Sequence, residues 1–135
     1  MMISLVLHVR SCEKHNIQAI HKEVKNMKME MGGIVDKKDS LQQDCGVIEL
    51  TNINGSFNPQ KDYEFLRIRG HQMRIMISWF EKFKIGDSIQ INSYEDKIII
   101  FRNVKKIDSL KLSKTLLYRK APVHFQAKSI LDFEE

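Results

Sequence analysis

The stretch that decides the fold runs from residue 65 to residue 103 and reads FLRIRGHQMRIMISWFEKFKIGDSIQINSYEDKIIIFRN. Apolar and polar side chains alternate within several short segments, which is the period of a β-strand with one buried face. Turn residues separate these segments at Gly70, at Gly86 and at 95–96. The pattern predicts strands at residues 63–68, 73–77, 89–91 and 98–101, with one helical turn at 79–83.

The residues before this stretch extend the β-rich region toward the N-terminus. An apolar run at 47–50 leads into Asn54-Gly55, which predicts a hairpin turn because both residues tolerate positive φ. The polar stretch 34–45 predicts a loop. Five or six short strands in about sixty residues are typical of a small antiparallel barrel or sandwich.

The N-terminal region shows two apolar periods in succession. From Met1 to Val9 apolar side chains mostly alternate with polar ones, which predicts a strand. Apolar residues then recur every three or four positions, which predicts an amphipathic helix over 16–31 that ends at Gly32 and Gly33. The first run is too short to cross a bilayer and does not resemble a signal peptide. We therefore expect no membrane segment, no export and a cytoplasmic location.

The C-terminal region predicts a further helix. Ile107, Leu110, Lys114 and Leu117 lie near helical spacing, and Pro122 limits any such helix. The sequence as a whole thus predicts an α+β fold, with an N-terminal strand and amphipathic helix packed on a small antiparallel β-barrel or sandwich. We expect a single domain over 1–135, divided into a strand-helix unit at 1–33, a β-rich core at 45–104 and a C-terminal extension at 105–135.

Charge is distributed unevenly along the chain. Residues 67–120 hold thirteen Lys and Arg against five Asp and Glu, a net of +8, whereas the whole chain has a net charge of +5. Such asymmetry indicates a basic surface that meets an anionic partner, although a solvated basic face is the simpler alternative. Arginine binds phosphate or guanine through two hydrogen bonds, and lysine supplies a point charge. The candidate nucleic-acid-binding residues are Arg67, Arg69, Arg74, Lys82, Lys84, Arg102, Lys105 and Lys106.

Part of the same stretch resembles a known family of DNA-binding proteins. Residues 74–77, the turn Ile85-Gly86-Asp87 and residues 96–100 follow one another as strand, turn and strand. In this order they resemble the AbrB and MazE swapped-hairpin family. The resemblance implies a homodimer that exchanges hairpins and binds DNA through basic loops and outer strands. With the charge pattern, it favours a small transcription regulator that binds DNA in preference to RNA.

Two other classes of function remain open. Short, basic proteins without a catalytic motif are also typical of inhibitors or adaptors that bind a protein partner. If the chain is an enzyme, His71 beside Arg69 and Arg74 favours a nuclease, with His71 as the base. No acidic cluster accompanies His71, and no phosphate-binding loop or catalytic motif is present, so the balance is against catalysis and we predict no cofactor.

The two cysteines indicate neither a disulfide-rich secreted protein nor a metal site. With two cysteines, Cys12 and Cys45, the chain lacks the pattern of a disulfide-rich secreted protein, and we expect reduced thiols. Cys12 and His15 have the spacing of a metal-ligand pair, but structural zinc sites use paired clusters of ligands. We predict no metal site.

Overall fold

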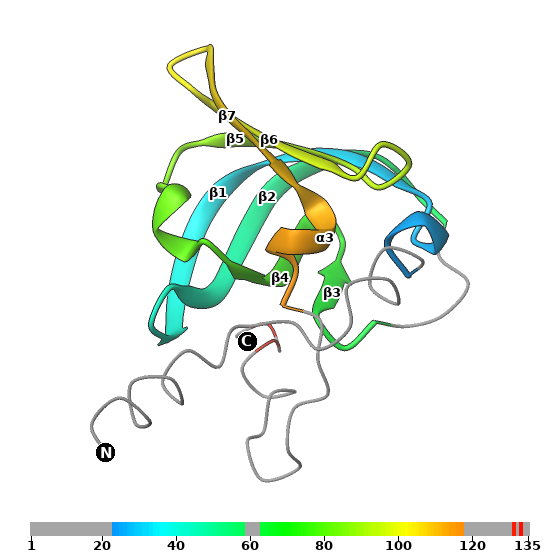
Figure 1. Cartoon of the computed structure of the whole chain (residues 1–135), viewed down its shortest axis with the longest axis horizontal. Helices are drawn as coiled ribbons and strands as arrows, with labels where there is room; N and C mark the ends of the chain where they lie inside the picture. The colour runs from blue at the N-terminus through cyan, green and yellow to red at the C-terminus, as the bar shows by residue number, and fades with distance from the viewer. Residues whose placement is uncertain (1–22, 59–62, 118–130, 132, 134–135) are drawn as a thin grey trace, which may run out of the picture.

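Seven β-strands form one antiparallel sheet in the computed structural model, which describes residues 23–58, 63–117, 131 and 133. The elements are β1 (Met29–Gln42), β2 (Cys45–Phe57), β3 (Leu66–Arg69), β4 (Gln72–Ser78), the 3-10 turn η1 (Phe80–Lys82), β5 (Ser88–Asn92), β6 (Lys97–Arg102), β7 (Lys105–Lys111) and the short helix α3 (Leu112–Thr115). The strands lie in the order β3-β4-β2-β1-β5-β6-β7. The hairpin of β1 and β2 is therefore central, with β4 and β3 beyond β2 and the β5-β6-β7 meander beyond β1 (Figure 1).

The central hairpin joins its two long strands through a two-residue turn. Gln43 and Asp44 form this turn, and Asp44 has a φ of 56°, which aspartate tolerates better than most residues. The register between β1 and β2 shifts at three places. Such bulges increase the twist of the paired strands, and both strands curve over the core in Figure 1.

The prediction of a loop at 34–45 is wrong, because most of this stretch belongs to β1. Its polar side chains conceal the strand, since many of them point to solvent while the backbone pairs with β2. Regular apolar alternation is a signal of one buried face, and the outer half of β1 lacks that face.

The prediction of a turn at Asn54-Gly55 is also wrong, because both residues lie inside β2. Gly55 has a φ of +118°, and a Cβ there would collide with the carbonyl oxygen of Glu30. The glycine is thus required by the close approach of β1 and not by a reversal of the chain. Gly32 and Gly33 likewise lie inside β1 and do not end a helix.

The chain after β7 returns to β4. Leu116 forms an isolated antiparallel bridge with Ile77, and the Leu117 N–H donates to the carbonyl oxygen of Met76 at 3.0 Å. The sheet therefore curls until the segment after its last strand meets β4 (Figure 1). The predicted C-terminal helix is largely replaced by β7, and α3 is only four residues long.

The core lies inside the curled sheet and is closed by aromatic side chains. Phe65 precedes β3 and Phe83 follows η1, and both are almost fully buried. β4 is buried on both of its faces, since Met73 and Ile75 point one way and Arg74 and Met76 point the other. This double burial makes β4 the most enclosed strand of the sheet.

The fold is mostly β, which overturns the α+β prediction. The predicted strand at 1–9 and the first part of the helix at 16–31 lie outside the described residues. Residues 23–26 are helical, with Val24 and the following Met27 buried, but the chain enters β1 at Met29. An N-terminal helix packed on a barrel is therefore not the architecture. The four strands predicted from the 65–103 stretch and the helical turn at 79–83 are confirmed as β3, β4, β5, β6 and η1.

Cys45 at the start of β2 is fully buried and forms a disulfide bond. The expectation of a reduced thiol is therefore wrong for this residue, and the chain's other cysteine, Cys12, lies outside the described residues. In the described part of the chain, no helix has both the length and the apolar composition needed to cross a bilayer.

Candidate nucleic-acid interface

Arg74, one of the eight predicted contacts, lies inside the protein. Its side chain is 5% exposed, its Nη1 donates to Glu49 Oε1 at 2.8 Å and its Nη2 donates to Asp39 Oδ2 at 2.9 Å. Burial lowers the pKa of Arg74, but the two carboxylates outweigh burial and raise the pKa above its ordinary value. The charge of Arg74 is thus compensated within the fold, and its side chain is too buried to contact a nucleic acid.

Arg67 and Arg69 lie on β3, at the end of the molecule opposite the β6–β7 hairpin (Figure 1). Arg67 Nη1 donates to the carbonyl oxygens of Tyr63 and Leu66, both at 3.0 Å. The Arg69 guanidinium lies 4.6 Å from the centre of the Phe133 ring. The structure therefore separates these two arginines from the predicted residues on β6 and β7.

His71, the candidate base of a nuclease, lies in the exposed turn between β3 and β4. Arg74, its predicted partner, points away into its ion pairs with carboxylates. Among the residues that the structure describes, no three His, Cys, Asp or Glu side chains form a group that could hold a metal ion. The predicted phosphate-binding set is thus not assembled around His71.

A buried carboxylate fastens the 84–87 turn to β6. Asp87 accepts two hydrogen bonds from Arg102, Nε to Oδ1 and Nη2 to Oδ2, both at 2.8 Å, and one from the Lys84 N–H at 2.9 Å. Burial raises the pKa of Asp87, but these hydrogen bonds and the two positive charges outweigh burial and lower the pKa below its ordinary value. Arg102 is therefore neutralised by Asp87 and acts as a brace for the β6-β7 hairpin.

The four predicted lysines gather near this brace. Lys82 Nζ lies 3.1 Å from Asp108 Oδ2, a pair that is partly exposed and hence weak. Lys84, Lys105 and Lys106 are exposed, and none of them forms an ion pair with another described residue. These three lysines keep their charge available to an anion.

Strand alternation places further side chains on an exposed face beside these lysines. Along β6, Lys97, Ile99 and Phe101 point outward, while Ile98 and Ile100 are fully buried. The register with β5 and β7 adds outward side chains at Ser88, Gln90, Asn92, Lys106, Ser109 and Lys111. We call the nine outward side chains of these three strands the β5–β7 face.

Positive charge on the β5–β7 face is only weakly offset by neighbouring carboxylates. Lys97 and Lys111 lie directly opposite each other in the register of β6 and β7. Like charges in that position destabilise a sheet. Glu95 Oε1 lies 3.9 Å from Lys97 Nζ, and both side chains are more than half exposed, so this ion pair is weak. A bound anion between Lys97 and Lys111 would relieve the repulsion.

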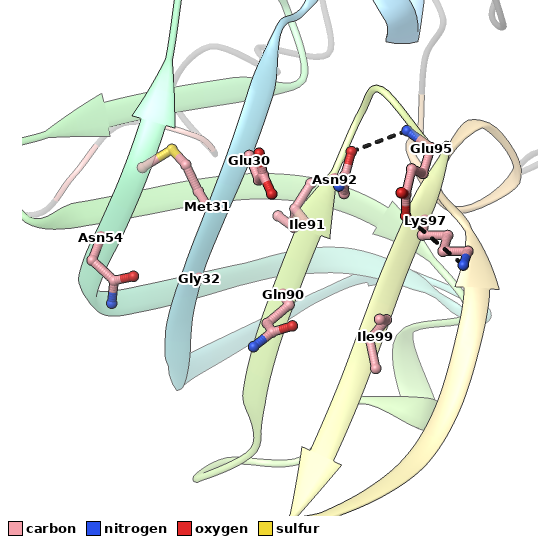
Figure 2. A pocket seen from close by; sticks show the side chains of 10 residues that line it. All are labelled: Glu30, Met31, Gly32, Asn54, Gln90, Ile91, Asn92, Glu95, Lys97 and Ile99. Carbon is pink, nitrogen blue, oxygen red and sulfur yellow. Dashed lines mark hydrogen bonds and ion pairs between the residues drawn. The ribbon is translucent and has the colours of Figure 1, made fainter.

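A hollow of about 340 Å³ adjoins the β5–β7 face where β2, β1, β5 and β6 lie side by side (Figure 2). Gly32 forms its floor, because it stands in register between Asn54 on β2 and Gln90 on β5 and carries no side chain. Glu30 and Lys97 border the same hollow. Glu95 lines the hollow as well, so it combines two carboxylates, three amides and one ammonium group around an open floor.

Several polar groups in the hollow keep hydrogen-bonding capacity. Asn92 Oδ1 accepts from the Glu95 N–H at 3.0 Å, which leaves the Asn92 amide nitrogen to donate. Asn54 Nδ2 donates to the Asn52 carbonyl at 3.4 Å, which leaves the Asn54 Oδ1 to accept. Neither Glu30 nor Gln90 uses its side chain in a hydrogen bond to any described residue.

Sequence reasoning missed Lys97, Lys111 and the residues of the hollow. Lys97 was detectable, because it alternates with Ile98 at the start of a correctly predicted strand. Lys111 was hidden by the predicted C-terminal helix, and Gln90 is an ordinary solvent-facing strand residue until its neighbours are known. Of the eight predicted contacts, Lys106 belongs to the β5–β7 face and Lys105 adjoins it.

No protein family, curated protein or solved structure matches this chain.

Proposed function

We propose that the protein binds a single strand of nucleic acid on the β5–β7 face. The observation that carries the proposal is the opposed pair Lys97 and Lys111, which share the outward face of β6 and β7 with Ile99 and Phe101. Proteins that bind single strands combine positive charge that follows the phosphates with side chains on which bases stack. The β5–β7 face presents both features on neighbouring strands.

The apolar side chains favour a single strand over a duplex. In a duplex the bases are stacked on each other and offer no free face to Phe101. In a single strand the bases can turn outward onto an aromatic or aliphatic side chain. Double-stranded DNA is the comparison that separates the two modes.

The DNA-binding regulator that the AbrB and MazE resemblance implies requires, in addition, a homodimer. The dimer was predicted from the AbrB and MazE resemblance and from open sheet edges. The edges are now known to be β3, with four residues, and β7, with exposed lysines, and both features oppose edge pairing. Light scattering decides this point: a mass near 15.9 kDa removes the dimer, and twice that mass supports it.

The test is fluorescence anisotropy with labelled strands of about twelve nucleotides, within the usual range of site sizes. DNA, RNA and duplex DNA are compared at about 50 mM and about 200 mM salt. We expect both single strands to bind more tightly than the duplex. Absence of binding by any strand at low salt would overturn the proposal and return the alternative of a protein-binding inhibitor.

Paired variants locate the interface. Lys97→Ala with Lys111→Ala should reduce the slope of log affinity against log salt by about 1.4, because each lost phosphate contact contributes about 0.7 for a single strand. Lys25→Ala with Lys114→Ala removes the same charge from exposed positions elsewhere and should leave the slope almost unchanged. Equal effects of the two double variants would show that only net charge matters.

A further inference from the structure

The hollow beside the β5–β7 face lies at the right distance from the lysines to hold one base of a bound strand. Strands in a sheet lie about 4.8 Å apart, so Lys97 on β6 and Glu30 on β1, which are in register through Asn92 on β5, are separated by about 10 Å. That distance is similar to the length of a nucleotide from its phosphate to the far edge of its base. A phosphate at Lys97 therefore places the base over β5 and β1, between Glu30 and the floor formed by Gly32.

The polar groups around this floor select among the four bases. Glu30 offers a carboxylate with two acceptor oxygens and no hydrogen-bond partner in the described part of the chain. Guanine carries two adjacent donors, N1–H and the N2 amino group, which match a carboxylate through two charge-assisted hydrogen bonds. Cytosine and adenine each offer one amino group beside a ring acceptor, and thymine offers one N–H between two carbonyls. The ring nitrogen or carbonyl oxygen of these bases would face a carboxylate oxygen with no hydrogen between them, so no second hydrogen bond could form.

The amides complete the match. Guanine O6 is an acceptor next to N1–H, and Gln90 and Asn92 each have an amide nitrogen able to donate to it. Ile99 offers an aliphatic surface for the flat face of the base at the border of the hollow. The hollow thus provides an acceptor at Glu30, donors at Gln90 and Asn92 and an apolar contact at Ile99 (Figure 2).

We infer that the hollow is a guanine site, in which Glu30 accepts hydrogen bonds from N1–H and the N2 amino group, and Gln90 donates to O6. This inference rests on the proposed binding of a single strand. It adds a base preference that the charge of the β5–β7 face cannot supply, because phosphate contacts are the same for every sequence.

The experiment measures the affinity of the full chain for three labelled DNA strands of equal length. One strand is all thymidine, one has a single deoxyguanosine at its centre, and one has deoxyinosine there, which lacks the N2 amino group. The guanine strand should bind about tenfold more tightly than the thymidine strand, which is the scale of one good bidentate contact. The inosine strand should lie between them.

Glu30→Gln tests the assignment of the carboxylate. It keeps the size of an exposed side chain but replaces one acceptor oxygen by a donor, so the preference for guanine should fall to within about twofold. Affinity for the thymidine strand should stay the same or rise slightly, because a negative charge near the phosphates is removed. Glu64→Gln, at an exposed position before β3, is the matched control and should keep the preference.

The outcomes separate this inference from the proposed function. If no strand binds, the single-strand proposal fails and the guanine site fails with it. If all strands bind equally well, or if Glu30→Gln retains the preference, the guanine site is overturned while single-strand binding stands. Unchanged melting temperatures of both variants are required to show that the fold is intact.

Discussion

Arg74 and Glu49 lie directly opposite each other on β4 and β2, with 2.8 Å between Nη1 and Oε1 and only 5% of each side chain exposed. Asp39 is the second carboxylate on Arg74, but its side chain is 55% exposed. The pair of Arg74 and Glu49 is therefore buried, whereas Asp39 is a solvated second partner of Arg74. Removal of Glu49 leaves the buried Arg74 charge with only the solvated Asp39 as a partner.

Glu49→Ala should lower the free energy of unfolding by about 3–5 kcal/mol, the usual cost of breaking a buried ion pair. Asp39→Ala should cost less than about 1 kcal/mol, because water can replace an exposed carboxylate. Urea denaturation of both variants measures the difference. Similar losses for the two variants would contradict the burial of the Glu49 pair.

Asp87 predicts a specific dependence of stability on pH. Its pKa is lowered in the folded protein, so the unfolded state binds the proton more readily as the solution is acidified. The stabilisation is fully present above the unfolded pKa of about 3.9 and is lost as pH falls through the lower folded pKa. Asp87→Asn should be less stable at neutral pH and should show a flatter decline below about pH 4. Thermal melts between neutral and strongly acidic pH test this, and parallel curves for both proteins would disprove it.

Gly55 and Gly70 form a matched pair of glycines with positive φ. A Cβ at Gly55 would collide with β1, whereas a Cβ at Gly70 has no heavy atom within 4 Å. Gly70→Ala should cost about 1–2 kcal/mol, the cost of a left-handed conformation alone. Gly55→Ala should cost clearly more and should reduce the population of folded protein. Circular dichroism during denaturation compares them, and an equal cost would mean that β1 can move away from Gly55.

Lys111→Glu should raise the stability of the fold and weaken its affinity for a single strand. An opposite charge facing Lys97 replaces the like-charge pair, which should raise the free energy of unfolding by roughly 0.2–1 kcal/mol. The same substitution should weaken single-strand binding strongly, because it places a negative charge in the path of the phosphates. Lys25→Glu is the control for net charge. A variant that is both less stable and fully able to bind would contradict the assigned role of the pair.

The sequence predicted the strands in which buried apolar residues recur, β3, β4, β5 and β6. Ile89, Ile91, Ile98 and Ile100 alternate with polar residues, and the strands that contain them were placed correctly. β1 was not predicted, because its outer half has little buried surface and because Gly32 and Gly33 have the pattern that usually ends a helix. That resemblance is local, whereas the reason for glycine at these positions is the approach of neighbouring strands.

The candidate site was predictable in its charge but not in its geometry. The excess of lysine and arginine is a property of the sequence, yet Arg74 and Arg102 are compensated by carboxylates that lie far away along the chain. Lys97 and Lys111 become a pair only through the register of β6 and β7. Cross-strand neighbours of this kind depend on pairing between distant residues, which no local pattern encodes.

The bridge between Ile77 and Leu116 also sets the order in which the chain can fold. β1 and β2 meet by closing a two-residue loop, an inexpensive and rapid step. The bridge can form only after the whole β5-β6-β7 meander has taken its place, so it depends on contacts of high sequence separation and forms late. Until then the edge of β4 beyond β3 has unpaired backbone groups that can capture a strand of another molecule. Refolding should therefore give a higher yield of monodisperse protein from dilute solution than from concentrated solution.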